Sequence, residues 1–142
     1  MYFKNLRNLI FLVTALFLFS CASKKDDAHD HHTGEGQNAW KEMDDFHMIM
    51  AETFHPYKDS ANLEPVKTRA AELMNAADLW ASATLPSRVD NETVKSKLLQ
   101  LKSEAAALAE SVKSADDNVI GDQLTKLHDT FHEIQEAWYG EN

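Results

Sequence analysis

The sequence predicts an all-α protein, an antiparallel up-down-up-down four-helix bundle over residues 38–142, behind a signal segment and a flexible tether. From residue 38 onward, apolar residues recur at spacings of three and four, as they do on the buried face of an α-helix. No stretch alternates apolar and polar residues as a half-buried strand does. Four helical segments of similar length are joined by short connections, which favours antiparallel neighbours. The alternative arrangement is an opened bundle whose helices pair with a second copy, a homodimer.

Residues 1–20 have the composition of a secretory signal. Lys4 and Arg7 precede a run of apolar residues that ends at Ser20, and this order of a basic start, an apolar middle and a small residue is typical of such signals. The run is shorter than the roughly 20 apolar residues that a membrane-spanning helix needs. We therefore expect residues 1–20 to be removed on export.

Cys21, the one cysteine of the chain, directly follows this segment. Residues 18–21, Leu-Phe-Ser-Cys, resemble the lipobox of bacterial lipoproteins, which implies cleavage before Cys21 and acylation of its thiol by palmitate-type chains. Residues 22–27 resemble the lysine-plus-acidic export tag of surface lipoproteins of the Bacteroidota; a plain hydrophilic spacer is the alternative. The resemblance implies an outer-membrane lipoprotein that faces the periplasm or the cell surface. Acylation would leave no thiol for a disulfide or a metal.

Residues 21–37 are expected to form a tether. After Cys21 they contain no apolar residue larger than alanine, so they cannot bury enough surface to fold. His29, His31 and His32 lie in this segment. These histidines could bind a metal weakly, but an exposed polar spacer is the preferred interpretation of such a short tract.

The first helix is expected from about Trp40 to Phe54. Residues 55–62 are expected to break it, because Pro56 disfavours helical backbone at the residue before it. The expected buried stripe of this helix consists of Trp40, Met43, His47, Met50 and Phe54.

Three further helices follow the same pattern. Pro65 suits the first turn of the second helix, a connection is expected around residues 85–91, and residues 114–118 form a turn rich in capping residues. The expected stripes are Val66, Ala70, Leu73, Ala77 and Trp80; then Val94, Leu98, Leu101, Ala105, Leu108 and Val112; then Ile120, Leu124, Leu127, Phe131, Ile134 and Trp138.

The charge and residue content of the chain disfavour several classes of function. The chain has 23 acidic and 14 basic residues and a net charge of −9 at pH 7, which disfavours binding to nucleic acid or to anionic lipid. No nucleophile–base pair, phosphate-binding loop or convergent acid pair stands out, so we expect no enzymatic activity.

The histidines carry the most distinctive chemistry. His128 and His132 are four residues apart, so a helix places them on one face one turn apart, the spacing by which helical zinc motifs hold one ion. If residue 40 lies level with residue 138 on an antiparallel fourth helix, His47 lies level with positions 130–132. We therefore expect His47, His128 and His132 to form a site for zinc or copper.

Two methionines and one more histidine are further candidate ligands. Met43 or Met50 could add a thioether that favours Cu(I). His55 lies eight residues from His47, about 12 Å along a helix axis, so these two cannot share an ion. We expect His55 to cap the helix end or to form a separate site.

Two stretches resemble the small periplasmic b-type cytochromes. They are residues 67–73, Lys-Thr-Arg-Ala-Ala-Glu-Leu, and residues 124–132, which end in the pair Phe131-His132. Members of that family are four-helix bundles that hold haem between a methionine on the first helix and a histidine on the fourth. The resemblance implies haem b between Met43 and His132. The related cytochrome c-prime family carries Cys-x-x-Cys-His, which this chain lacks, so covalent haem attachment is not expected.

The favoured function is therefore metal buffering, delivery or sensing by a lipid-anchored envelope protein. A non-covalent haem-binding electron carrier is the first alternative. The second is a ligand-free structural or partner-binding lipoprotein, in which His47 is a core histidine hydrogen-bonded to Asp44 or Gln135.

Overall fold

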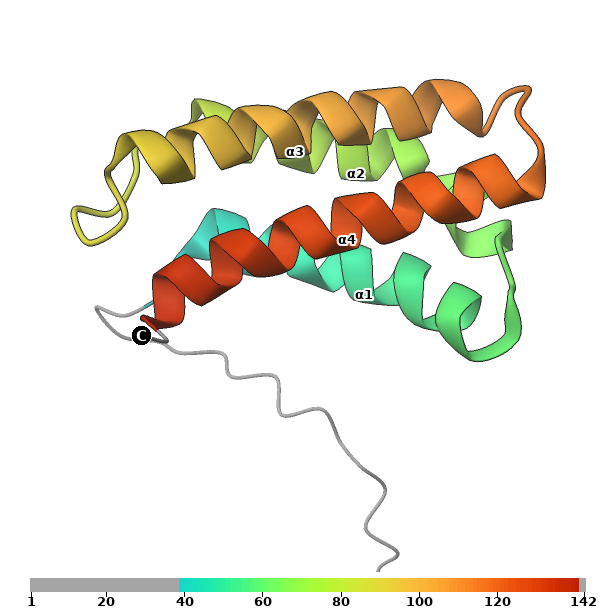
Figure 1. Cartoon of the computed structure of the whole chain (residues 1–142), viewed down its shortest axis with the longest axis horizontal. Helices are drawn as coiled ribbons and strands as arrows, with labels where there is room; N and C mark the ends of the chain where they lie inside the picture. The colour runs from blue at the N-terminus through green and yellow to red at the C-terminus, as the bar shows by residue number, and fades with distance from the viewer. Residues whose placement is uncertain (1–38, 141–142) are drawn as a thin grey trace, which may run out of the picture. The chain divides into compact units, whose positions relative to one another are not determined.

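The structure, a computed structural model, describes residues 39–140, which form an all-α bundle of four helices without strands (Figure 1). The helices are α1 (Lys41–Ser60), α2 (Glu64–Ser82), α3 (Glu92–Ser111) and α4 (Asp117–Tyr139). The all-α four-helix prediction is confirmed. The signal segment, Cys21 and the tether with its three histidines lie outside the described residues. Among the helices of residues 39–140, none is both long and apolar enough to cross a membrane.

Each helix packs against the next one along the chain, and α4 also packs against α1 (Figure 1). Ring contacts join α1 and its N-cap residue to α4, namely Trp40 with Trp138, Phe46 and His47 with Phe131, and Phe54 with His128. Residue numbers rise along α1 as they fall along α4, so these two helices run in opposite directions. The register agrees with the one expected from the sequence, in which residue 40 lies level with residue 138.

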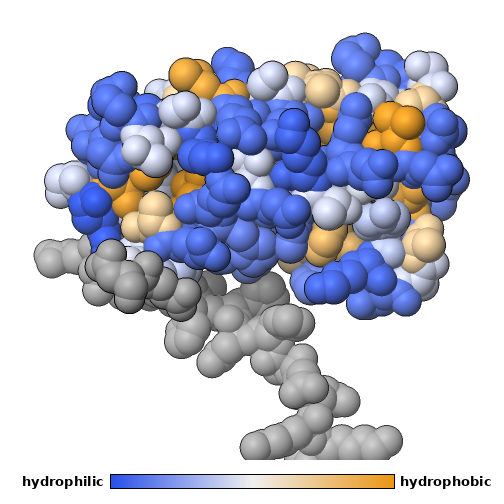
Figure 2. Space-filling model, viewed as in Figure 1, coloured by the Kyte–Doolittle hydropathy of each residue, from blue (hydrophilic) through white to orange (hydrophobic). Residues whose placement is uncertain are grey.

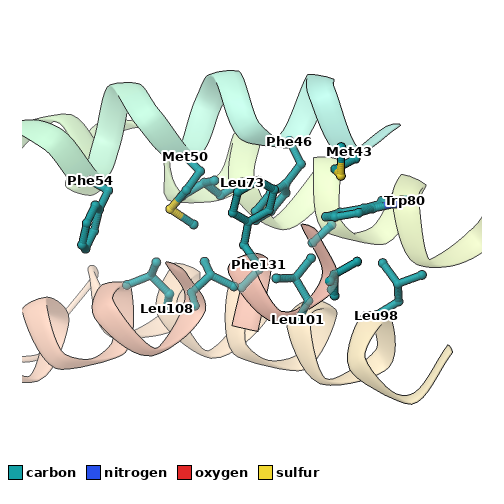
Figure 3. Close-up of a cluster of buried hydrophobic side chains, with 14 of the residues drawn as sticks. Met43, Phe46, Met50, Phe54, Leu73, Trp80, Leu98, Leu101, Leu108 and Phe131 are labelled. Atoms are coloured by element: carbon teal, nitrogen blue, oxygen red, sulfur yellow. The ribbon is translucent and has the colours of Figure 1, made fainter. Parts of the chain in front are cut away.

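The core lies between the four helices and is rich in aromatic rings and leucines (Figure 3). The buried stripes of α2 and α4 contain every residue expected there, and the stripe of α3 differs at its end. Val112 is the residue after α3 and is only partly buried. Ala109 is buried as well.

The stripe of α1 corrects one expectation. Phe46 is fully buried, whereas its neighbour His47 is exposed. Both positions fit a spacing of three or four from Met43 and Met50, so periodicity alone did not separate them. The phenylalanine is inside because its ring gains more from leaving water, and a buried imidazole would need a partner for its ring N–H.

The end of α1 corrects a second expectation. The helix continues through Pro56 to Ser60 instead of breaking at residue 55. The Ser60 hydroxyl donates to the Pro56 carbonyl over 2.9 Å, and Ala61, at φ 55°, ends the helix. A proline inside a helix costs about 3 kcal/mol. Tyr57 packs on the core and over Gly121 of α4, and these contacts favour the helical path beyond Pro56.

Polar caps start the later helices. The Asn91 side chain accepts a hydrogen bond from the Val94 amide over 3.0 Å at the start of α3. Asp116 accepts from the amides of Asn118 and Val119 at the start of α4. The expected capping at this turn is confirmed, but the turn ends at Asp116 rather than at residue 118, because α4 begins at Asp117. These bonds satisfy amides that have no partner inside the helix.

Candidate functional site

The histidine pair expected on the fourth helix lies on α4. The Nε2 atoms of His128 and His132 are 3.0 Å apart, and the ring centroids are 4.4 Å apart at an interplanar angle of 70°. Two nitrogens bound to one ion at 2.0–2.1 Å lie about 2.9 Å apart at a right angle and about 3.3 Å apart at the tetrahedral angle. The pair therefore has the spacing of two ligands of a single metal ion.

Aromatic rings hold both imidazoles in place. His128 stacks on Phe54 of α1, with centroids 3.7 Å apart and planes 13° apart. His132 meets Phe131 edge-on, with centroids 5.4 Å apart. Because Phe54 and Phe131 are themselves buried, they restrict the orientation of the two rings.

The surroundings of His128 favour its neutral form. Partial burial lowers the pKa of His128, the neighbouring His132 lowers it further, and the hydrogen bond to Asp129 opposes the shift. The positive charge of Lys58 on α1 acts in the same direction as burial. The His128 side chain still exposes 21% of its surface. A neutral imidazole with access to solvent is in the form that binds metal ions.

His47, the third ligand expected, lies on the α1 side of the same region. Its ring is exposed and stacks on Phe131, with centroids 5.1 Å apart. The nearby Asp44 interacts with it electrostatically: burial raises the pKa of Asp44, and His47 opposes that rise. His47 and His132 thus both contact Phe131. Within residues 39–140, however, no three His, Cys, Asp or Glu side chains are grouped so that they could hold a metal ion.

The remaining candidate ligands are not assembled around the pair. His55 is exposed on α1. Met43 and Met50 are buried in the core with their thioethers among apolar side chains (Figure 3).

The interior between Met43 and His132 does not fit a haem as it stands. The rings of Phe46, Trp80 and Phe131 fill it, with centroids 5.6 to 6.2 Å apart. The Nε2 atom of His132 faces His128 rather than Met43. A porphyrin could enter between the two axial candidates only if these rings moved apart.

Two hollows lie away from the histidine pair. One, of about 420 Å³, lies at the α2–α3 connection between Leu85 and Leu99, and the other, of about 240 Å³, lies between α1 and α2 beside Ile49 and Leu79. Figure 2 shows a mostly hydrophilic face with small, separate apolar patches. Such scattered apolar residues are ordinary on a protein surface.

Sequence reasoning missed the residues that support the pair. The apolar pattern predicts Phe54 as a core residue only, and it indicates no role for Lys58. The expected register carried only an approximate signal, because it places Phe54 level with residue 124, one helical turn from His128. Comparison with protein-family models, with curated proteins and with solved structures found no match for this chain.

Proposed function

We propose that this chain is a lipid-anchored envelope protein whose bundle binds a transition-metal ion, zinc or copper, through His128 and His132. The 3.0 Å separation of their Nε2 atoms carries the proposal. In the absence of metal, one Nε2–H donates to the other nitrogen. To bind an ion, both Nε2 atoms must offer their lone pairs, so that proton moves through solvent to the Nδ1 atom of the same ring and both imidazoles stay neutral.

The fold supports rigid presentation of the two ligands. Helical spacing sets their separation, and stacking on Phe54 restrains His128. Ligands held in place before binding lose less conformational entropy when the ion arrives. His47 contacts the same Phe131 ring as His132 but is not included in the proposed ligand pair, because the described residues contain no group of three potential ligands.

The proposal includes the finer topology and the anchor. Up-down-up-down connectivity is supported by the opposite directions of α1 and α4 and by the short connections between successive helices. Acylation of Cys21 would hold the bundle at the outer membrane, where buffering, delivery or sensing of metal ions would take place. Intact-mass measurement of the membrane-extracted protein tests the anchor, because diacylation adds a defined mass at Cys21 and cleavage removes residues 1–20.

Metal uptake by the purified protein tests the site. Titration calorimetry with Zn²⁺ and Cu²⁺ should show saturable binding that His128→Ala and His132→Ala each abolish. His55→Ala is the matched control, since it removes an exposed histidine of α1 that lies outside the pair. Equal binding by all four proteins, or none by the wild type, would refute the proposal.

The same sample tests the haem alternative. Absorption spectra after expression with haem supply would show a Soret band if haem is bound. A band that Met43→Ala and His132→Ala remove would favour the electron-carrier function. We expect no such band, because the rings of Phe46, Trp80 and Phe131 fill the interior.

A further inference from the structure

We infer that the ion is shared by two copies of this chain, each contributing His128 and His132. This inference rests on the metal binding proposed above. It names the partner that completes the site, and that partner is a second copy of the protein.

The pair alone leaves the coordination of zinc unfinished. Structural zinc sites hold four protein ligands in a tetrahedron, and catalytic sites hold three. The pair supplies two, and the described residues contain no group of three potential His, Cys, Asp or Glu ligands. A further imidazole, that of His47, lies against Phe131 and interacts with Asp44. A second His128–His132 pair would bring the ligand number to four.

The position of the pair allows a second copy to approach. Both rings are only partly buried on the outer side of α4, where α4 meets α1. Two such helices crossing at the ion would bring four imidazoles together without opening either core. A pocket that enclosed the pair would instead favour completion by water or a small ligand.

Charges of both signs lie beside the pair. Lys58 affects His128 from the α1 side, and Asp129 bonds to His128 on α4 at 3.5 Å. A two-fold axis through the ion exchanges equivalent positions between copies, so it can set Lys58 of one copy opposite Asp129 of the other. The net charge of −9 per chain opposes association in general. Dimerisation should therefore require the ion and should be favoured by salt screening.

Native mass spectrometry of the full chain, released from detergent, tests the inference with Zn²⁺ as the probe. The expected result is a monomer without zinc and a dimer holding one Zn²⁺ per two chains when zinc is added. His128→Ala and His132→Ala should each remove both the zinc and the dimer. His47→Ala and His55→Ala should leave the dimer unchanged. Circular dichroism of the metal-free variants checks that they remain folded.

Each alternative outcome is informative. One zinc per monomer, lost in His47→Ala, would overturn the shared site but support the proposed metal binding within a single chain. A zinc-dependent dimer that persists in the His128→Ala/His132→Ala variant would overturn the inference as well. No zinc uptake at all would overturn both the inference and the proposed function.

Discussion

Gly121 on α4 is expected to resist substitution by alanine, although alanine is the better helix former. A Cβ atom added at Gly121 would lie 2.5 Å from the Tyr57 hydroxyl oxygen, 2.7 Å from its Cζ and 2.9 Å from its Cε2. All three distances are shorter than real Cβ contacts, so the ring of Tyr57 would have to move. Because Tyr57 is part of the packing that carries α1 through Pro56, that movement would disturb the end of α1.

Two opposing energies decide whether Gly121→Ala raises or lowers the free energy of unfolding. Replacing glycine by alanine inside a helix stabilises it by about 1 kcal/mol. Forcing an extra carbon into a packed contact costs about 1–3 kcal/mol. Here the blocking group is a whole ring edge, so the packing cost should exceed the helix gain. We expect Gly121→Ala to lower the free energy of unfolding by about 1 kcal/mol.

A double-mutant cycle with Tyr57→Ala measures this balance. In the Tyr57→Ala background the obstacle is gone, so Gly121→Ala should instead raise the free energy of unfolding by up to about 1 kcal/mol. The coupling energy would then be about 2 kcal/mol. Urea denaturation followed by helix circular dichroism provides the four values. Stabilisation of equal size in both backgrounds would refute the proposed contact between Tyr57 and Gly121.

Three further predictions concern the site and the scaffold. Phe54→Ala should lower the free energy of unfolding by about 3–5 kcal/mol. Because it exposes His128, it should also raise the pKa of His128 toward the usual value of 6.5. NMR titration of the histidine ring protons measures the direction of that change. The lowered pKa of His128 means that the unfolded chain binds more protons than the folded one between that pKa and 6.5, so metal-free stability should fall as the pH drops below about 6.5. His128→Gln should flatten that part of the stability profile, and an unchanged slope would contradict the pKa direction. Asn91→Ala removes the α3 cap and should cost about 1 kcal/mol, seen as a fall in Tm of about 4–8 °C. Ser103→Ala, at an exposed position of α3, should be milder.

The buried residues could be predicted from the sequence in the helices whose apolar residues form a single stripe. In α2 and α4 the apolar residues define a single stripe, and the expected residues are the buried ones. In α1 two stripes were possible, because Phe46 and His47 are adjacent and both fit the spacing. Deciding between them requires the relative gain of burying each ring, which periodicity does not include. The local rule for Pro56 failed for a similar reason, since the contact of Tyr57 with α4 is invisible in the sequence of α1.

The candidate site, too, could be predicted from the sequence only in part. The spacing of four residues was enough to bring His128 and His132 together. Helical rise also placed His47 at the correct level along α1, where it meets Phe131. Its direction around the helix was wrong, because direction depends on which neighbour enters the core. The level of a residue along the helix axis follows from counting residues. The direction in which its side chain points around the helix depends on packing against the neighbouring helices.

The tryptophans have a consequence for optical experiments. All three are in contact at one end of the bundle, with Trp40 at 5.1 Å from Trp80 and 5.4 Å from Trp138 by ring centroids. His128 is ten residues from Trp138 along α4, about 15 Å along the helix axis. Tryptophan fluorescence, excited without the tyrosines, therefore reports on this end alone, while far-ultraviolet circular dichroism averages over the whole bundle. A difference between the two unfolding curves would show that the tryptophan end and the histidine end unfold separately. Quenching of the tryptophan fluorescence by Cu²⁺ but not by Zn²⁺ would report an ion bound at the histidine pair.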